Sequence, residues 1–123
     1  MPANRVLYVD GDTDTRTMLK FMLGLSELDA VGAPDAQAAL HLMEHERFSL
    51  YVLDGGLASV HGLSLCAQIR AVDAQTPIVI FSGHGYASDI DAGMLAGANA
   101  YLVKPDSSEL IPTIRRLLAA AAG

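Results

Sequence analysis

Short apolar runs alternate with helical patterns along the whole chain, and this alternation constrains the fold more than any other feature of the sequence. The runs that begin at Arg5, Leu50, Pro77 and Ala100 are continuous and apolar, as is typical of strands buried on both faces. A weaker run over residues 29–33 is typical of an edge strand. The alternation predicts an α/β fold, with a doubly wound five-stranded parallel sheet and helices on both faces.

Apolar residues at helical spacing predict five helices between and after these strands. They fall within residues 18–25, 36–43, 65–69, 88–96 and 110–118. Asp106 followed by Glu109 resembles a capping box at the start of the last helix, and Pro112 would then fall in its first turn.

Four strand-like runs lead into residues that can handle phosphate or metal. Asp10, Asp54, Ser82 and Lys104 each end such a run or follow it directly, and Asp12 lies close behind Asp10. Because parallel strands share one carboxyl edge, and ligands of doubly wound folds bind there, these side chains should converge. Two carboxylates, a hydroxyl and an ammonium suit a divalent metal and a phosphoryl group.

Composition limits the class of protein. A chain of 123 residues with 51% hydrophobic residues predicts one domain spanning 1–123. A net charge of −6 argues against direct binding of nucleic acid, and there is no apolar stretch near the ~20 residues that a membrane helix needs. Cys66 is the only cysteine, which fits a reducing cytoplasm and predicts a small core residue.

Four motifs together resemble the receiver domain of two-component response regulators. They are Val9-Asp10, Asp54 with Gly62 eight residues later, Ser82-Gly83, and the run from Gly97 to Lys104-Pro105. The resemblance covers nearly the whole chain, and it implies a flavodoxin-like sheet with strand order 2-1-3-4-5.

The resemblance also implies a role for each matched residue. Asp54 would accept a phosphoryl group from the phosphohistidine of a histidine kinase or phosphotransfer protein. Asp10, Asp54 and the backbone carbonyl of Gly56 would hold Mg²⁺. Lys104 and Ser82 would contact the phosphoryl oxygens, as suits a reaction that depends on positioning and charge neutralisation.

Further implications concern signalling rather than metabolic catalysis. Tyr101 would be an aromatic switch that follows Ser82, and His84 would border the phosphoryl site and modulate the loss of phosphate, unless it is only an exposed loop histidine. The output face would be the fourth helix, fifth strand and fifth helix. The expected partners are an output domain or partner protein, with a dimer that could form on phosphorylation. The domain would not be an enzyme that turns over a metabolite.

The sequence departs from the family pattern at two places. Gly11 stands where the family usually has a second acidic residue, which removes a direct metal ligand. Asp12 could replace it, because Gly11 permits unusual backbone angles, or could cap the first helix, which is the interpretation we favour. Ala58 stands where the family often has proline, which predicts a softer loop after Asp54.

Two alternative functions remain open at this stage. A degenerate pseudo-receiver would bind partners without phosphorylation. A small phosphatase of the haloacid-dehalogenase type would use Asp10 as nucleophile and Asp12 as acid/base, but it would leave Asp54 without a role, and no acidic pair follows the last strand.

One further motif has its own interpretation. His41-Leu42-Met43-Glu44-His45 matches the H-x-x-E-H pattern of inverted zinc peptidases, in which two histidines four residues apart share a metal. No third ligand is evident from the sequence, so we expect a solvated helix face.

Overall fold

The centre of the molecule is a five-stranded sheet in which all paired strands are parallel. The computed structural model describes residues 4–56 and 64–122. The strands are β1 (Arg5–Val9), β2 (Asp29–Ala33), β3 (Leu50–Leu53), β4 (Ile78–Ser82) and β5 (Ala100–Val103). Their order is β2-β1-β3-β4-β5, which confirms the predicted fold class and strand order.

Five helices connect and follow the strands. They are α1 (Thr13–Leu25), α2 (Ala36–His45), α3 (Leu65–Val72), α4 (Ala87–Leu95) and α5 (Leu110–Ala122). The first three begin behind a short polar residue, Asp12, Asp35 or Ser64, whose side chain accepts a backbone N–H three residues along the chain. This contact satisfies an N–H that has no partner within the helix, and so it fixes where each helix begins.

The capping box predicted for α5 is wrong. The carboxylate of Asp106 accepts the backbone N–H of Ser108 at 2.9 Å and its hydroxyl at 2.6 Å. A short acidic side chain readily bonds to the backbone two residues further on, and the resulting turn delays the helix to Leu110. Pro112 is the third residue of α5, so it lies in the first turn as expected.

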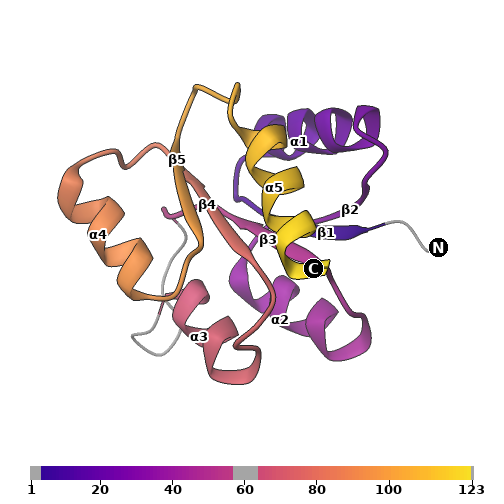
Figure 1. Cartoon of the computed structure of the whole chain (residues 1–123), viewed down its shortest axis with the longest axis horizontal. Helices are drawn as coiled ribbons and strands as arrows, with labels where there is room; N and C mark the ends of the chain where they lie inside the picture. Colours follow the sequence, from indigo (N-terminus) through magenta and orange to yellow (C-terminus); the bar gives the residue numbers. More distant parts are fainter. Residues whose placement is uncertain (1–3, 57–63, 123) are drawn as a thin grey trace.

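Helices cover both faces of the sheet (Figure 1), and an apolar cluster fills the space on each face. On one face, α1 and α5 pack against the strands through residues that include Leu19, Leu23, Leu110 and Ile114. On the other face, α2 and α3 contribute Ala36, Ala39, Leu65, Cys66 and Ile69. Cys66 is buried as predicted, and burial raises the pKa of its thiol.

Close packing explains why β2 looked weak in the sequence. Gly32 of β2 pairs with Tyr8 of β1, and a Cβ at Gly32 would lie 2.4 Å from a ring carbon of Tyr8. A larger residue at position 32 would raise the β-propensity of the strand but would displace the ring of Tyr8. The glycine is therefore explained by its close packing against this ring.

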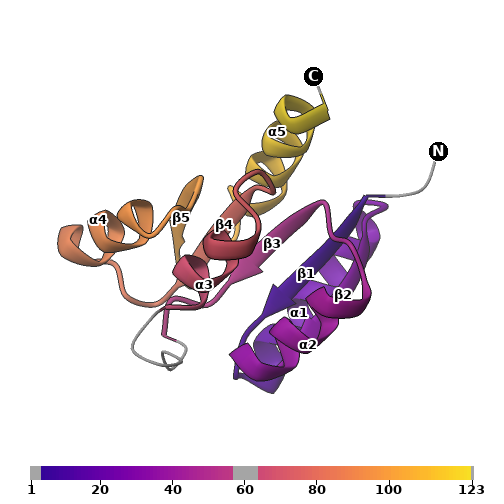
Figure 2. The same cartoon turned by 90° about the horizontal axis from the view of Figure 1, so that it is seen from below.

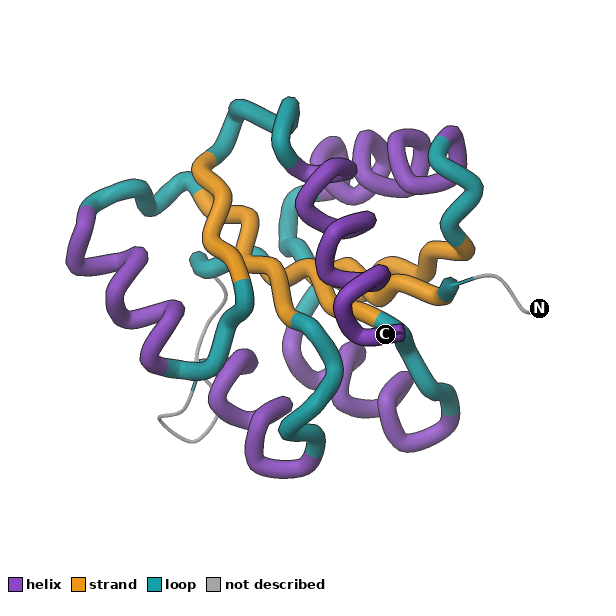
Figure 3. Tube along the Cα trace, in the orientation of Figure 1, coloured by secondary structure: helices purple, strands orange, loops and turns teal. Residues whose placement is uncertain are grey.

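The remaining helix, α4, lies beside the β5 edge and away from α1 and α2 (Figure 2). None of the residues Ala87–Leu95 is fully buried. The segments that follow β4 and β5 leave the sheet at the carboxyl ends of the strands (Figure 3). The predicted site lies at these ends. In the described part of the chain, no helix has the length and apolarity needed to cross a membrane.

Candidate functional site

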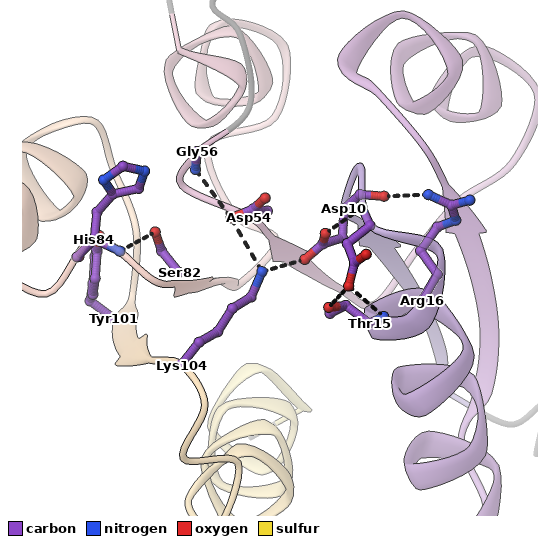
Figure 4. A network of polar contacts seen from close by, with 10 residues as sticks. Asp10, Thr15, Arg16, Asp54, Gly56, Ser82, His84, Tyr101 and Lys104 are labelled. Carbon is purple, nitrogen blue, oxygen red and sulfur yellow. Dashed lines mark hydrogen bonds and ion pairs between the residues drawn. The ribbon is translucent and has the colours of Figure 1, made fainter.

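Strand register brings the predicted residues to one edge of the sheet. The backbone N–H of Asp54 donates to the carbonyl of Val9 at 2.9 Å, so Asp10 and Asp54 follow adjacent, aligned strands. The N–H of Lys104 donates to the carbonyl of Ser82 at 2.8 Å, which aligns the other two strands. The convergence expected from the sequence is therefore present (Figure 4).

Lys104 bridges the two carboxylates. Its Nζ lies 2.6 Å from Oδ2 of Asp10 and 3.5 Å from Oδ1 of Asp54. The side chain of Asp10 is only 3% exposed, whereas that of Asp54 is 18% exposed. Asp54 is thus the carboxylate that a reagent from solution can reach, and Asp10 lies behind it.

The charges in this pocket shift the pKa of Lys104. Burial lowers the pKa of Lys104, but its hydrogen bond to Asp10 and the negative charges of Asp54 and Asp10 outweigh burial, and the pKa lies above its usual value. Lys104 therefore remains a cation throughout the neutral range, and the three charged groups leave the pocket with one net negative charge.

The backbone after Asp54 folds back over its carboxylate. The N–H of Gly56 donates to Oδ1 of Asp54 at 3.1 Å. A Cβ at Gly56 would lie 3.2 Å from Nε2 of His84, so the imidazole packs directly against this backbone. The exposed imidazole of His84 therefore lies against the loop that follows Asp54.

His84 also links the two predicted switch residues through its main chain. Its N–H donates to Oγ of the fully buried Ser82 at 3.1 Å, and its carbonyl accepts a hydrogen bond from the hydroxyl of Tyr101. Among the described residues no hydrogen bond uses the hydroxyl hydrogen of Ser82. That hydrogen can therefore donate to a group that arrives at the pocket.

A cavity of about 360 Å³ lies beside these residues, between α3 and α4. Its lining includes Asp54, His84 and Tyr101, together with Cys66 of α3 and Gly93 of α4. The ring of Tyr101 lies close to Gly93, where a Cβ would approach a ring carbon to 2.8 Å. Movement of the tyrosine would therefore change the packing of α4.

Asp12 caps α1. Its carboxylate accepts the N–H of Thr15 at 3.1 Å and the hydroxyl of Thr15 at 2.7 Å, which confirms the favoured interpretation. These bonds lower the pKa of Asp12. The unusual backbone that Gly11 could have adopted is not seen, because Gly97 is the only described glycine with a positive φ.

Sequence reasoning missed Arg16. Its guanidinium donates to the backbone carbonyl of Asp10 at 2.8 Å and so ties α1 to the end of β1. The arginine lies one turn into the helix, and no pattern in the sequence distinguishes it from a solvated residue. Two residues considered from the sequence, Ala58 and Gly62, lie outside the described residues.

The donor set fits Mg²⁺. Two carboxylates close enough to share one ammonium already form a cation site, and hard oxygen ligands are those that Mg²⁺ prefers. Asp10 and Asp54 offer these oxygens, and the Gly56 backbone lies against the carboxylate of Asp54. Gly11 offers none.

Comparison with known proteins gives the family. The model of the response regulator receiver domain matches residues 6–115. The chain belongs to this family. The receiver domain is 36% identical over 115 residues to the transcriptional regulatory protein PrrA of Mycobacterium tuberculosis, covering 93% of this chain and 49% of that protein. It is 34% identical to the response regulator MprA of Mycolicibacterium vanbaalenii, covering 93% and 50%.

Solved structures agree with this assignment. The receiver domain of the Francisella response regulator 1452 superposes with a TM-score of 0.87 at 26% identity, covering 95% of this chain and 98% of that one. NtrX from Brucella abortus gives a TM-score of 0.89 at 27% identity, covering 98% and 28%. The receiver domain spans about half the length of the curated relatives that it matches.

Proposed function

We propose that this receiver domain accepts a phosphoryl group on Asp54 in a Mg²⁺-dependent reaction and switches its α4–β5–α5 face in response. Phosphorylation on aspartate is the general function of the family to which the chain belongs. The observation that supports the proposal for this chain is the pair of carboxylates, Asp10 and Asp54, that Lys104 bridges. Lys104 joins a buried carboxylate to a solvent-accessible one, and only the latter can meet a phosphodonor.

The transfer would proceed by direct displacement. An Oδ atom of Asp54 attacks the phosphorus of a phosphohistidine, the new O–P bond forms as the P–N bond breaks, and the leaving imidazole recovers a proton. Mg²⁺, when bound by Asp10, Asp54 and the carbonyl of Gly56, would neutralise charge on the phosphoryl oxygens. Lys104 pairs with one of these oxygens, since its ammonium already lies 3.5 Å from Asp54.

The switch would begin at Ser82. Its free hydroxyl hydrogen donates to the new phosphoryl group, and movement toward that group breaks its contact with the N–H of His84. Because Tyr101 is bonded to the carbonyl of the same histidine, the loop and the ring respond together. The packing of the ring against Gly93 carries the change to α4.

The proposed partners follow from this role. A histidine kinase or phosphotransfer protein would supply the phosphoryl group, and an output domain or partner protein would bind the switched face. The domain is then a signalling module, not an enzyme with a metabolite substrate. We place it in the cytoplasm, where such kinases present their phosphohistidines.

The test is the intact mass of the chain after incubation with acetyl phosphate and Mg²⁺. The wild type should gain one phosphoryl group, whereas Asp54→Asn and a sample with the metal chelated should gain none. A folded wild-type chain that stays unmodified, but still binds a partner, would favour the phosphorylation-independent pseudo-receiver. Steady phosphatase turnover lost in Asp10→Asn and retained in Asp54→Asn would instead indicate the dehalogenase-type alternative.

A further inference from the structure

Three potential metal ligands gather at the end of α2, away from the acidic pocket. The residues are His41, Glu44 and His45, and all three are exposed, which confirms the solvated face expected from the sequence. The structure adds that one ligand atom from each lies within 4.8 Å of the others. Glu44 thus places a potential third ligand, which was not evident from the sequence alone, beside the two histidines.

The local geometry allows the two histidines to bind one metal ion together. Residues four apart lie on one face of a helix, and the two imidazole rings meet edge to face with centroids 4.8 Å apart. Zinc binds imidazole nitrogen at about 2.0–2.1 Å, so two nitrogens on one metal are about 3.3 Å apart. The ligand atoms of the three residues lie within 4.8 Å of one another, so rotation of the exposed side chains has at most about 1.5 Å to close.

These ligands are not engaged elsewhere. Within residues 4–56 and 64–122, no hydrogen bond or ion pair involves the side chains of His41, Glu44 or His45. A metal would therefore displace water and one imidazole contact, not a structural bond. This contrasts with Asp10 and Asp54, which already share an ammonium.

The electrostatic setting also favours a cation. α2 ends at His45, and the last carbonyls of a helix carry partial negative charge. Glu44 adds a full negative charge beside them. Arg5, which reaches this end of the helix through a 2.6 Å ion pair with Glu46, also pairs with Asp29 at 2.7 Å, so its charge is balanced.

We infer that His41, Glu44 and His45 form a surface site for a borderline-soft divalent transition metal, of which Zn²⁺ and Cu²⁺ are the type ions. Two imidazole nitrogens and one carboxylate oxygen bind the metal, and water completes its coordination. Imidazole suits these ions, whereas Mg²⁺ requires hard oxygen ligands, so the site is chemically distinct from the acidic pocket. The metal bridges the last turn of α2 and stabilises it.

Calorimetric titration of the tag-free chain with Zn²⁺, in excess Mg²⁺ to occupy the acidic pocket, tests this site. We expect one Zn²⁺ per chain, with affinity at least about tenfold weaker in His41→Gln and in His45→Gln, because each loses one of two nitrogen ligands. Glu44→Gln should weaken binding less. His84→Gln, which removes a histidine beside the acidic pocket, is the matched control and should bind as the wild type does.

Thermal unfolding gives an independent readout. At the same Zn²⁺ concentration, Zn²⁺ should raise the midpoint of the wild type and of His84→Gln more than that of His41→Gln, since a ligand that binds only the folded state stabilises it in proportion to its affinity. Equal Zn²⁺ affinity in the wild type and His41→Gln would overturn the proposal. A loss in His84→Gln as large as that in His41→Gln would do so too, because it would place the metal at the acidic pocket.

Discussion

Restoring an acidic residue at position 11 should strengthen Mg²⁺ binding. Gly11 is exposed beside Asp10, and a Cβ there would meet only the carbonyl of Pro34, at 3.7 Å. Its φ lies outside the left-handed region, so an L-residue fits without strain. Gly11→Asp should therefore fold normally and bring a third carboxylate to the pocket.

The size of the effect follows from charge. A carboxylate about 5 Å from a unit charge interacts by about 0.8 kcal/mol in water and about 3 kcal/mol at an effective dielectric constant of 20. The exposure of position 11 favours the lower value, and the double charge of Mg²⁺ raises it to about 1.5–2 kcal/mol. The dissociation constant for Mg²⁺ should thus fall by about 10–30-fold.

The assay is calorimetric titration with Mg²⁺ at fixed ionic strength, because salt screens an exposed charge. Gly11→Asn is the matched control, since it adds a side chain of the same shape without the charge, and it should bind Mg²⁺ nearly as the wild type does. Equal affinities for Gly11→Asp and Gly11→Asn would refute the reasoning. They would show that the metal binds too far from this position to sense its charge.

Three further substitutions test how partly buried charges and hydrogen-bond donors contribute to the stability of the fold. Lys104→Met should destabilise the fold by about 2 kcal/mol in chemical denaturation, because Asp10 is left buried without its cation, and adding Asp10→Asn should recover part of the loss. Arg70→Ala should cost about 2–3 kcal/mol in the same assay, since the guanidinium donates to the carbonyls of Gly97, Asp73 and Thr76 and to the Asn99 side chain; a loss below 0.5 kcal/mol would contradict this. Tyr51 tests alkaline stability: burial, then the nearby Asp73 carboxylate, raises its pKa to about 12, so its contribution is present below the ordinary pKa near 10 and is lost as pH rises toward 12. Tyr51→Phe should flatten the fall in unfolding free energy between pH 10 and 12, and an unchanged slope would contradict the assignment.

The fold could be predicted because its signals are local and repeated. Apolar runs ending at Val9 and Leu53 mark strands that are buried, as expected. The run ending at Val103 does form a parallel strand, but the expectation that it is buried on both faces is wrong, because β5 lies at the edge of the sheet and none of its residues is buried. The carboxyl ends of parallel strands must share an edge, so the meeting of Asp10 with Lys104, 94 residues apart, followed from topology alone. Even the weak strand over Asp29–Ala33 was identifiable.

Other features depend on contacts that a sequence does not encode locally. Asp106 and Glu109 have the spacing of a capping box, but the carboxylate of Asp106 accepts the N–H of Ser108 instead. Which N–H it accepts depends on the conformation of the backbone, which the sequence does not specify. No pattern in the sequence indicates that Arg70 of α3 joins two loops, the one that precedes β4 and the one that precedes β5. The metal-ligand geometry of Glu44 required knowledge of where its side chain lies relative to both histidines.

Locating the phosphoryl group on the chain tests the central claim most directly. After reaction with acetyl phosphate and Mg²⁺, borohydride reduces an aspartyl phosphate to an alcohol and leaves free carboxylates unchanged, and peptide mass spectrometry then identifies the residue. We predict that Asp54 alone is converted. Conversion of Asp10 or Asp12, or equal conversion with and without Mg²⁺, would contradict a metal-assisted transfer to the accessible member of the Lys104-bridged pair.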